Sequence, residues 1–104
     1  MDYNSSVHQI FKSATFDEWF TKLHDRQAKS RIAARIDRLA VGNPGDVRPV
    51  GSGVSEMRIN YGPGYRVYFV QRGSIVVVVL CAGDKRTQDT DIKRAIEIAA
   101  SWKD

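Results

Sequence analysis

A glycine-rich turn between two alternating segments, followed by an apolar run, most constrains how this 104-residue chain can fold. Residues 57–60 (Met-Arg-Ile-Asn) precede the turn Gly62-Pro63-Gly64, and residues 65–69 (Tyr-Arg-Val-Tyr-Phe) follow it. Turn residues between two alternating segments are typical of a hairpin. Residues 75–80 are then almost entirely Ile and Val, and a strand that is apolar on both sides belongs inside a sheet covered on two faces. The pattern therefore predicts an antiparallel hairpin beside a buried central strand.

Periodicity and turn signals predict the remaining elements. A first strand is expected over residues 7–12. Thr15 to Glu18 match a capping box, which predicts a helix that begins at Phe16. Asp25 is expected to cap a second helix that ends before residues 42–45, Gly-Asn-Pro-Gly. Strands follow at residues 46–50, 54–60, 65–71 and 74–81, and Asp89-Thr90-Asp91 leads a final helix.

The order β-α-α-β-β-β-β-α predicts an α+β fold formed by residues 1–104 as a single domain. We expect a mainly antiparallel twisted sheet with a helical hairpin packed on one face and a C-terminal helix. A hydrophobic fraction of 42% and a charged fraction of 27% are typical of a globular domain. The single Cys81 cannot form an internal disulfide and is interpreted as a small buried hydrophobic residue.

Neither a secretory signal nor a bilayer-spanning apolar run is recognised, so the expected location is the cytoplasm, without a membrane partner. Metal and cofactor binding are not expected. His8, His24 and Cys81 are too widely spaced along the chain to match a ligand motif.

Alternation along the hairpin predicts which side chains share a face. If Asn60 pairs with Arg66, Met57 lies opposite Phe69 and Ile59 opposite Val67 on an apolar face that packs on helices. The opposite face then carries Glu56, Arg58, Asn60, Arg66 and Tyr68. We therefore predict that Arg58 and Arg66 project from neighbouring strands on the same side of the sheet.

These side chains favour a nucleic-acid partner. The guanidinium group offers a planar set of donors that matches phosphate oxygens, and a tyrosine can stack on a base. A net charge of +4 favours polyanions, although it also suits an acidic protein. Asn60 and Tyr68 are predicted to contact RNA. Arg31, Arg35 and Arg38 on the second helix form either a solvated face or a further contact with a nucleic acid or partner.

The chain resembles the RelE/ParE superfamily of toxins, and within it the HigB-like "addiction module killer protein" branch. The resemblance rests on residues 50–69, on Gly83-Asp84-Lys85-Arg86-Thr87-Gln88 with Asp91-Ile92, on residues 16–19 and on the passage from Arg35 to Asp46. It implies the toxin of a type II toxin–antitoxin system that inhibits translation by ribosome-dependent cleavage of mRNA. The implied partners are the ribosome, mRNA and a helix-turn-helix antitoxin.

Carried over by position, the resemblance implies catalytic roles for Arg58, Arg66, Lys85 and Arg86. Cleavage by the RNA's own 2′-hydroxyl requires a base, stabilisation of a dianionic phosphorane and protonation of the leaving oxygen. Permanently charged arginines suit the second task, and Lys85 or Arg86 could bind phosphate or assist the leaving group. Glu56 is either the general base or an ion-pair partner of the arginines.

Two positions depart from the nuclease pattern. Asn60 stands where the best-known nuclease branch has a second lysine, and Asp91-Ile92 stands near the place of its tyrosine. Two alternatives to an endoribonuclease therefore remain. One is a ParE-like DNA gyrase poison on the same fold, and the other is a non-catalytic protein-binding module neutralised by an antitoxin.

Overall fold

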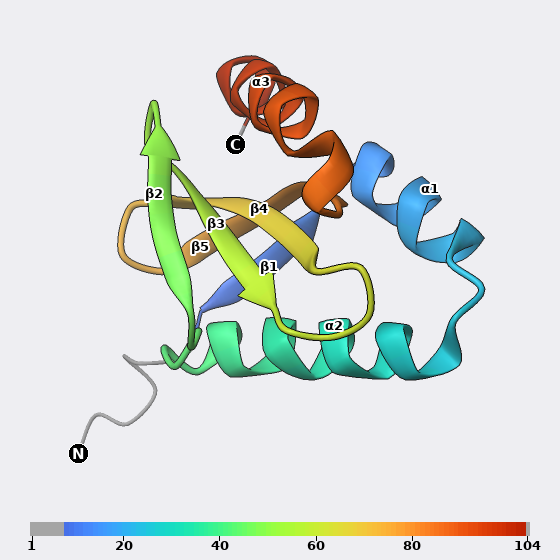
Figure 1. Cartoon of the computed structure of the whole chain (residues 1–104). Helices are drawn as coiled ribbons and strands as arrows, with labels where there is room; N and C mark the ends of the chain where they lie inside the picture. The colour runs from blue at the N-terminus through green and yellow to red at the C-terminus, as the bar shows by residue number, and fades with distance from the viewer. Residues whose placement is uncertain (1–7, 104) are drawn as a thin grey trace.

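The computed structural model describes residues 8–103, which form a five-stranded sheet with three α-helices (Figure 1). The elements in chain order are β1 (Gln9–Lys12), α1 (Ala14–Lys22), α2 (Arg26–Ala40), β2 (Val47–Gly51), β3 (Val54–Ile59), β4 (Tyr65–Arg72), β5 (Val76–Gly83), the short 3₁₀ turn η2 (Lys85–Thr87) and α3 (Gln88–Ser101). The predicted α+β class and element order are confirmed. Val7, at the start of the first predicted strand, lies outside the described residues.

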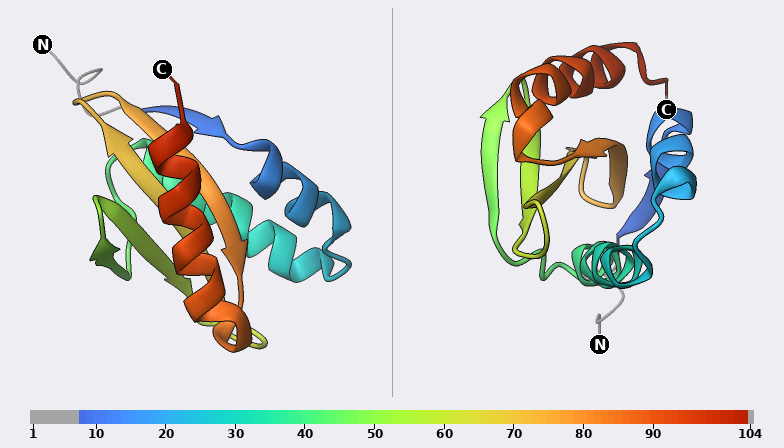
Figure 2. Two further views of the ribbon diagram at one scale, coloured as in Figure 1. Left: turned by 90° about the horizontal axis from the view of Figure 1, so that it is seen from above. Right: turned by 45° about the vertical axis from the view of Figure 1, so that its right-hand side comes forward.

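The strands are arranged in the order β1-β5-β4-β3-β2. β1 pairs with β5 in parallel, and the other pairs are antiparallel. Helices cover both faces of the sheet, with α1 and α2 on one side and α3 on the other (Figure 2). The alternating side chains of β5 serve both cores, because Val77 and Val79 face α1 and α2 whereas Val78 and Leu80 face α3. This arrangement confirms the prediction for the apolar run.

The first helix begins earlier than predicted, because Ser13 rather than Thr15 is its N-cap. The Ser13 hydroxyl accepts a hydrogen bond from the backbone N–H of Phe16 and donates one to the carbonyl oxygen of Leu80 in β5. A side chain that caps α1 and also bonds the central strand fixes the helix against the sheet. The prediction that the helix begins at Phe16 was therefore wrong, because the cap depends on a strand distant in sequence.

The second helix matches its prediction. Asp25 is the N-cap, and its carboxylate accepts hydrogen bonds from the backbone N–H groups of Gln27 and Ala28. The apolar stripe of α2 is buried against the sheet and comprises Ala28, Ile32, Ile36 and Leu39. Burial of one stripe leaves the basic residues of α2 to the sides and outer face of the helix.

The predicted register of the β3–β4 hairpin was wrong by two residues, although the predicted faces were right. Arg58 lies opposite Arg66, and Glu56 lies opposite Tyr68. Because side chains alternate with a period of two, a slip of two residues exchanges the partners but leaves every side chain on its face. Met57, Ile59, Val67 and Phe69 accordingly join the core under α1 and α2. Arg58 and Arg66 share the opposite face, as predicted.

Candidate anion-binding site

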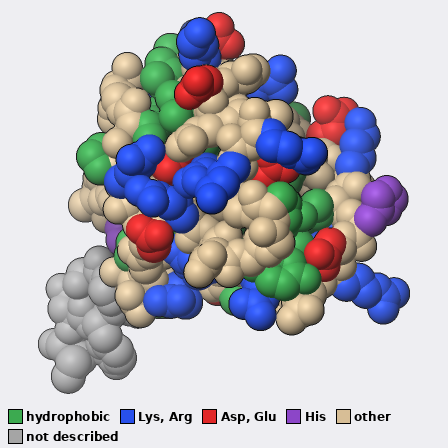
Figure 3. Space-filling view, in the orientation of Figure 1, with side chains coloured by type: hydrophobic (Ala, Val, Ile, Leu, Met, Phe, Trp, Pro, Cys, Tyr) green, Lys and Arg blue, Asp and Glu red, His purple; other side chains and the backbone are tan. Residues whose placement is uncertain are grey.

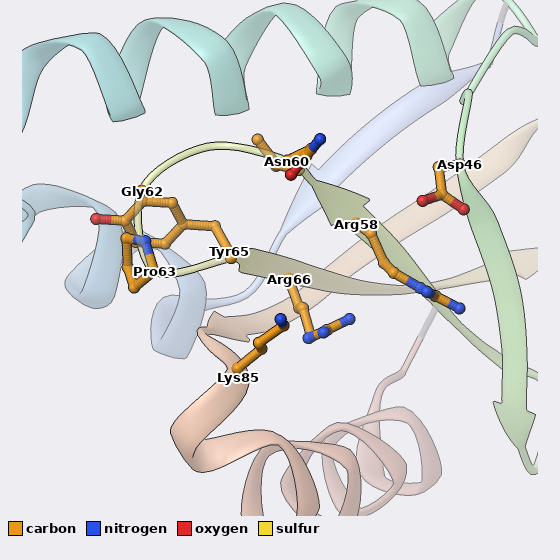
Figure 4. Close-up of a pocket in the computed structure, with 10 residues that line it drawn as sticks. Asp46, Arg58, Asn60, Gly62, Pro63, Tyr65, Arg66 and Lys85 are labelled. Carbon is orange, nitrogen blue, oxygen red and sulfur yellow. The ribbon is translucent and has the colours of Figure 1, made fainter.

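A pocket of about 330 Å³ lies at one end of the β3–β4 hairpin, on the face of the sheet that carries α3. Arg58 of β3, Arg66 of β4 and Lys85 of η2 line it, together with Asp46, Tyr65 and the hairpin loop 60–64. Figure 4 shows Lys85 pointing toward Arg66, whereas the Arg58 guanidinium extends toward β2, on the side of the Asp46 carboxylate. The structure thus brings together three of the four residues predicted to be catalytic.

Glu56 holds the arginines of this face in place. Its carboxylate is fully buried, and one oxygen, Oε1, lies 3.4 Å from Nη1 of Arg66, 3.6 Å from Nε of Arg58 and 3.3 Å from Nε of Arg48. The other oxygen accepts hydrogen bonds from the Tyr68 hydroxyl at 2.9 Å and from the Gln88 amide at 2.8 Å. Three strands and the start of α3 therefore meet at one carboxylate.

Opposing effects act on the pKa of Glu56. Burial disfavours the charged carboxylate and would raise its pKa, whereas the hydrogen bonds from Gln88 and Tyr68 and the charges of Arg66 and Arg48 favour it. The balance lowers the pKa below its ordinary value. Glu56 therefore remains a carboxylate held by five groups. Of its two predicted roles, the contacts favour the ion-pair partner over the general base.

The positive charges near Glu56 are not fully compensated. Three guanidinium groups converge on a single carboxylate, and Lys85 lies in the adjoining pocket. The Nε atoms of Arg58 and Arg66 are also buried without a hydrogen-bond partner among the described residues. A buried donor that lacks a partner costs free energy, and the excess of positive charge over the single Glu56 carboxylate favours an anion in the adjoining pocket. The arrangement is suited to a phosphate group.

The hairpin loop sets the width of the pocket beside Lys85. Gly64 has a φ of +82°, a conformation that favours glycine, and a Cβ there would lie 3.3 Å from Cγ of Lys85. Tyr61 holds the loop to the start of α2, because its hydroxyl donates a hydrogen bond to the Asp25 carboxylate. The glycine therefore permits a close approach between the loop and η2.

Arg86, the fourth residue predicted to be catalytic, lies outside the pocket lining. Its guanidinium pairs with the Asp84 carboxylate at 2.9 Å, and its side chain is 82% exposed. Asp84 also caps η2 by accepting from the backbone N–H of Arg86. The structure therefore distinguishes the two members of the basic pair, because Lys85 faces the pocket and Arg86 faces solvent.

The three arginines of α2 that were predicted to bind RNA have different environments. The Arg35 guanidinium donates to the carbonyl oxygens of Pro44 at 2.8 Å and Arg58 at 2.7 Å, so it joins α2 to the segment before β2 and to β3. Arg31 lies over the Tyr61 ring, 4.7 Å from its centroid. Arg38 is exposed. Arg35 is thus part of the structural framework, while Arg31 and Arg38 are exposed. The RNA contacts of these three arginines stay predictions.

Tyr68 requires a correction. It lies on the predicted face but is 0% exposed beneath α3, where its hydroxyl donates to Glu56. A ring without exposed surface cannot stack on a base, so we remove Tyr68 from the predicted RNA contacts. Asn60 is exposed and lines the pocket.

Sequence reasoning missed Arg48 and Asp46. Arg48 lies opposite Glu56 on β2, and Asp46 precedes that strand. Pairing β2 with β3 from their alternation would have placed Arg48 beside Glu56. Figure 3 shows Lys and Arg side chains gathered in a band over β3 and β4, with acidic side chains between them.

A second pocket of about 320 Å³ lies beside Cys81, Asp91 and Arg94. Cys81 is buried, as predicted, and burial raises the pKa of its thiol to about 12. Within residues 8–103, no group of three or more His, Cys, Asp or Glu side chains could hold a metal ion. In the same part of the chain, none of the helices has the length and apolarity required to cross a bilayer.

The fold matches that of a solved structure. It is similar to the structure of the Escherichia coli toxin RelE in the free state, determined for a mutant with two arginine-to-alanine changes. The similarity has a TM-score of 0.70 and covers 88% of this chain and 96% of RelE, at 12% sequence identity. The fold expected from the resemblance to the RelE/ParE superfamily is thus confirmed, whereas the HigB-like branch stays a prediction.

The family follows from the sequence match. Residues 18–103 match the family described as phage derived protein Gp49-like (DUF891), and the chain belongs to that family. An uncharacterized protein of Haemophilus influenzae is 51% identical over 87 residues, which cover 84% of this chain and 88% of that relative.

Proposed function

We propose that this protein is the toxin of a toxin–antitoxin pair and that its pocket cleaves RNA. The Gp49-like family and the RelE-like fold support the first part of the proposal. One observation carries the second part, which is that Arg58, Arg66 and Lys85 line one pocket while Glu56 fixes the two guanidinium groups. Fixed cations around an open pocket stabilise a phosphorane without reorganising during the reaction.

The proposed reaction is attack by the 2′-oxygen of RNA on the adjacent phosphorus. The 2′-O–P bond forms, the P–O5′ bond breaks, and the products are a 2′,3′-cyclic phosphate and a 5′-hydroxyl end. Arg58 and Arg66 stabilise the dianionic phosphorane, and Lys85 supplies the proton to the leaving 5′-oxygen. Asp46 receives the proton from the 2′-hydroxyl, because its carboxylate lines the pocket whereas that of Glu56 is enclosed.

The partners of this activity are proposed with it. Translating ribosomes present the mRNA, and a helix-turn-helix antitoxin neutralises the toxin in the cytoplasm. The exposed basic residues Arg31 and Arg38 of α2 and Arg86 of η2 offer further contacts to RNA or to an acidic partner.

Cleavage of a transcript on translating ribosomes tests the proposal. We expect Arg66→Ala to lower the cleavage rate by roughly 100-fold or more, because a donor to the phosphorane is lost. The fold should persist, since Arg48 and Arg58 still pair with Glu56. Asp46→Asn should retain RNA binding and lose cleavage.

Growth inhibition and DNA supercoiling give independent readouts for the same variants. If the wild-type protein inhibits gyrase and leaves transcripts intact, the gyrase alternative replaces the proposal. If unrestrained expression leaves growth unaffected and no transcript is cut, the non-catalytic alternative replaces it. Full cleavage by Arg66→Ala would show that the pocket is not the active site.

A further inference from the structure

We propose that Arg48 forms a second phosphate subsite beside the pocket, so that the bound strand crosses β4, β3 and β2 in turn. The inference rests on the proposed RNA function and adds the path of the substrate. It assigns a binding role to a residue on the edge strand of the sheet, one strand beyond the pocket.

The three arginines at Glu56 form a row of increasing exposure. Their side chains are 10% exposed for Arg66 on β4, 38% for Arg58 on β3 and 52% for Arg48 on β2. Neighbouring strands lie about 4.8 Å apart, so the three arginines follow one another from the pocket to the edge strand of the sheet. If one phosphate of a nucleic-acid strand binds at Arg66 and Lys85, the next phosphate would lie near Arg48.

Arg48 is held in position although half of it is exposed. Its Nε donates to Oε1 of Glu56 at 3.3 Å, and the buried carboxylate is itself fixed by Tyr68 and Gln88. An ordinary surface arginine loses rotamer freedom when it binds a ligand, whereas Arg48 has already lost part of it. The contact to Glu56 uses Nε, and no hydrogen bond within residues 8–103 occupies the terminal nitrogens, which remain for a ligand.

The charge balance also favours a second anion. One phosphodiester in the pocket brings one negative charge to a cluster in which three arginines and Lys85 outnumber the carboxylates of Glu56 and Asp46. Arg48 lies outside the pocket lining, so a phosphate bound among Arg58, Arg66 and Lys85 leaves it for the next phosphate of the strand. Single strands bind to grooves of this kind through successive backbone contacts.

Binding of 2′-deoxy oligonucleotides tests the subsite without cleavage, because the attacking hydroxyl is absent. A dinucleotide with one phosphodiester is compared with a trinucleotide that has two, and with a trinucleotide whose second linkage is a neutral methylphosphonate. Titrations followed by NMR measure each Kd for the wild type, Arg48→Ala, Arg48→Lys and the control Lys12→Ala. Lys12 is an exposed cation on the opposite edge strand, β1.

We expect the wild type and Lys12→Ala to bind the charged trinucleotide roughly tenfold more tightly than the dinucleotide. Arg48→Ala should remove this difference and leave the dinucleotide affinity unchanged, while Arg48→Lys should restore part of it. If the difference persists in Arg48→Ala, or if both ligands weaken equally, the subsite is wrong although RNA binding stands. If none of the ligands binds the wild-type protein, the proposed RNA function fails together with the subsite.

Discussion

Glu56 is fully buried where three arginines converge on it, and both its oxygens are occupied by polar side chains. A buried charge is tolerated when it is paired and hydrogen-bonded, and removal of its partners leaves a costly isolated charge. At this site the carboxylate also gives Arg58 and Arg66 a defined direction. The residue therefore acts through other side chains, as a positioning residue of the pocket.

Replacement of this carboxylate has a defined pH signature. We expect Glu56→Gln to lower the free energy of unfolding at pH 7 by about 2–3 kcal/mol, because three arginines lose their shared counter-charge. The folded-state pKa of Glu56 lies below its ordinary value of 4.5, so the stabilisation is complete above that pH. It is lost as the pH falls through the lowered folded-state pKa.

Urea titrations between pH 3 and pH 7 measure this difference. The gap between wild type and Glu56→Gln should narrow below about pH 4.5. Glu97→Gln, a change at an exposed position of α3, is the matched control and should follow the wild type. A gap that stayed constant with pH would contradict a stabilising ionised Glu56.

At the scale of elements, two side chains join segments that are distant in sequence. Ser13 connects the start of α1 to β5, and Arg35 connects the middle of α2 to Pro44 and to β3. Both bonds end on backbone carbonyl groups, which require partners when they are shielded from water. These contacts position the helices against the sheet, and Arg35 additionally fixes the chain just before Asp46.

The corrected helix cap can be tested directly. Ser13→Ala should lower the free energy of unfolding by about 1–2 kcal/mol, because the Phe16 N–H and the Leu80 carbonyl both lose a partner. Thr15→Ala, two residues later, should change it by less than about 0.5 kcal/mol, since Thr15 lies inside the helix. Chemical denaturation of both variants decides between the caps. A larger loss for Thr15→Ala would restore the cap that the sequence pattern predicted.

Two arginines one turn apart on α2 form a second matched pair. Arg35→Ala should cost about 2 kcal/mol of folding stability and should weaken cleavage, because the segment that carries Asp46 loses its anchor. Arg38→Ala removes an exposed charge from the same helix and should leave stability within about 0.5 kcal/mol. Thermal unfolding compares the two, and equal effects would contradict the structural role of Arg35.

At the scale of the whole molecule, a net charge of +4 is distributed so that cations concentrate over β3 and β4 (Figure 3). A phosphate backbone that binds there displaces counterions, so its affinity depends on salt. The effect belongs to the assembled fold, because Lys85 and the two pocket arginines come from three different elements.

The salt dependence of binding to a single-stranded, uncleavable oligonucleotide measures this charge. With one phosphate bound in the pocket and the next at Arg48, log K should fall with log salt concentration at a slope of about −1.4. Arg66→Gln should reduce the slope in magnitude by about 0.7, whereas the exposed control Lys93→Gln should leave it unchanged. Fluorescence anisotropy at several salt concentrations provides the slopes. An unaltered slope for Arg66→Gln would exclude its contact with phosphate.

Local sequence patterns were sufficient to predict the element order, the apolar stripe of α2, the central strand β5 and the face on which Arg58 and Arg66 lie. These features follow from periods of two and 3.6 residues, which are local properties of the chain. Tertiary structure decided the register of the hairpin, because a slip of two residues preserves the same alternation. It likewise decided the roles of Ser13, Arg35 and Tyr68, each of which depends on a partner from another element. A pattern indicates which side a residue faces, and only the packed fold determines what it meets there.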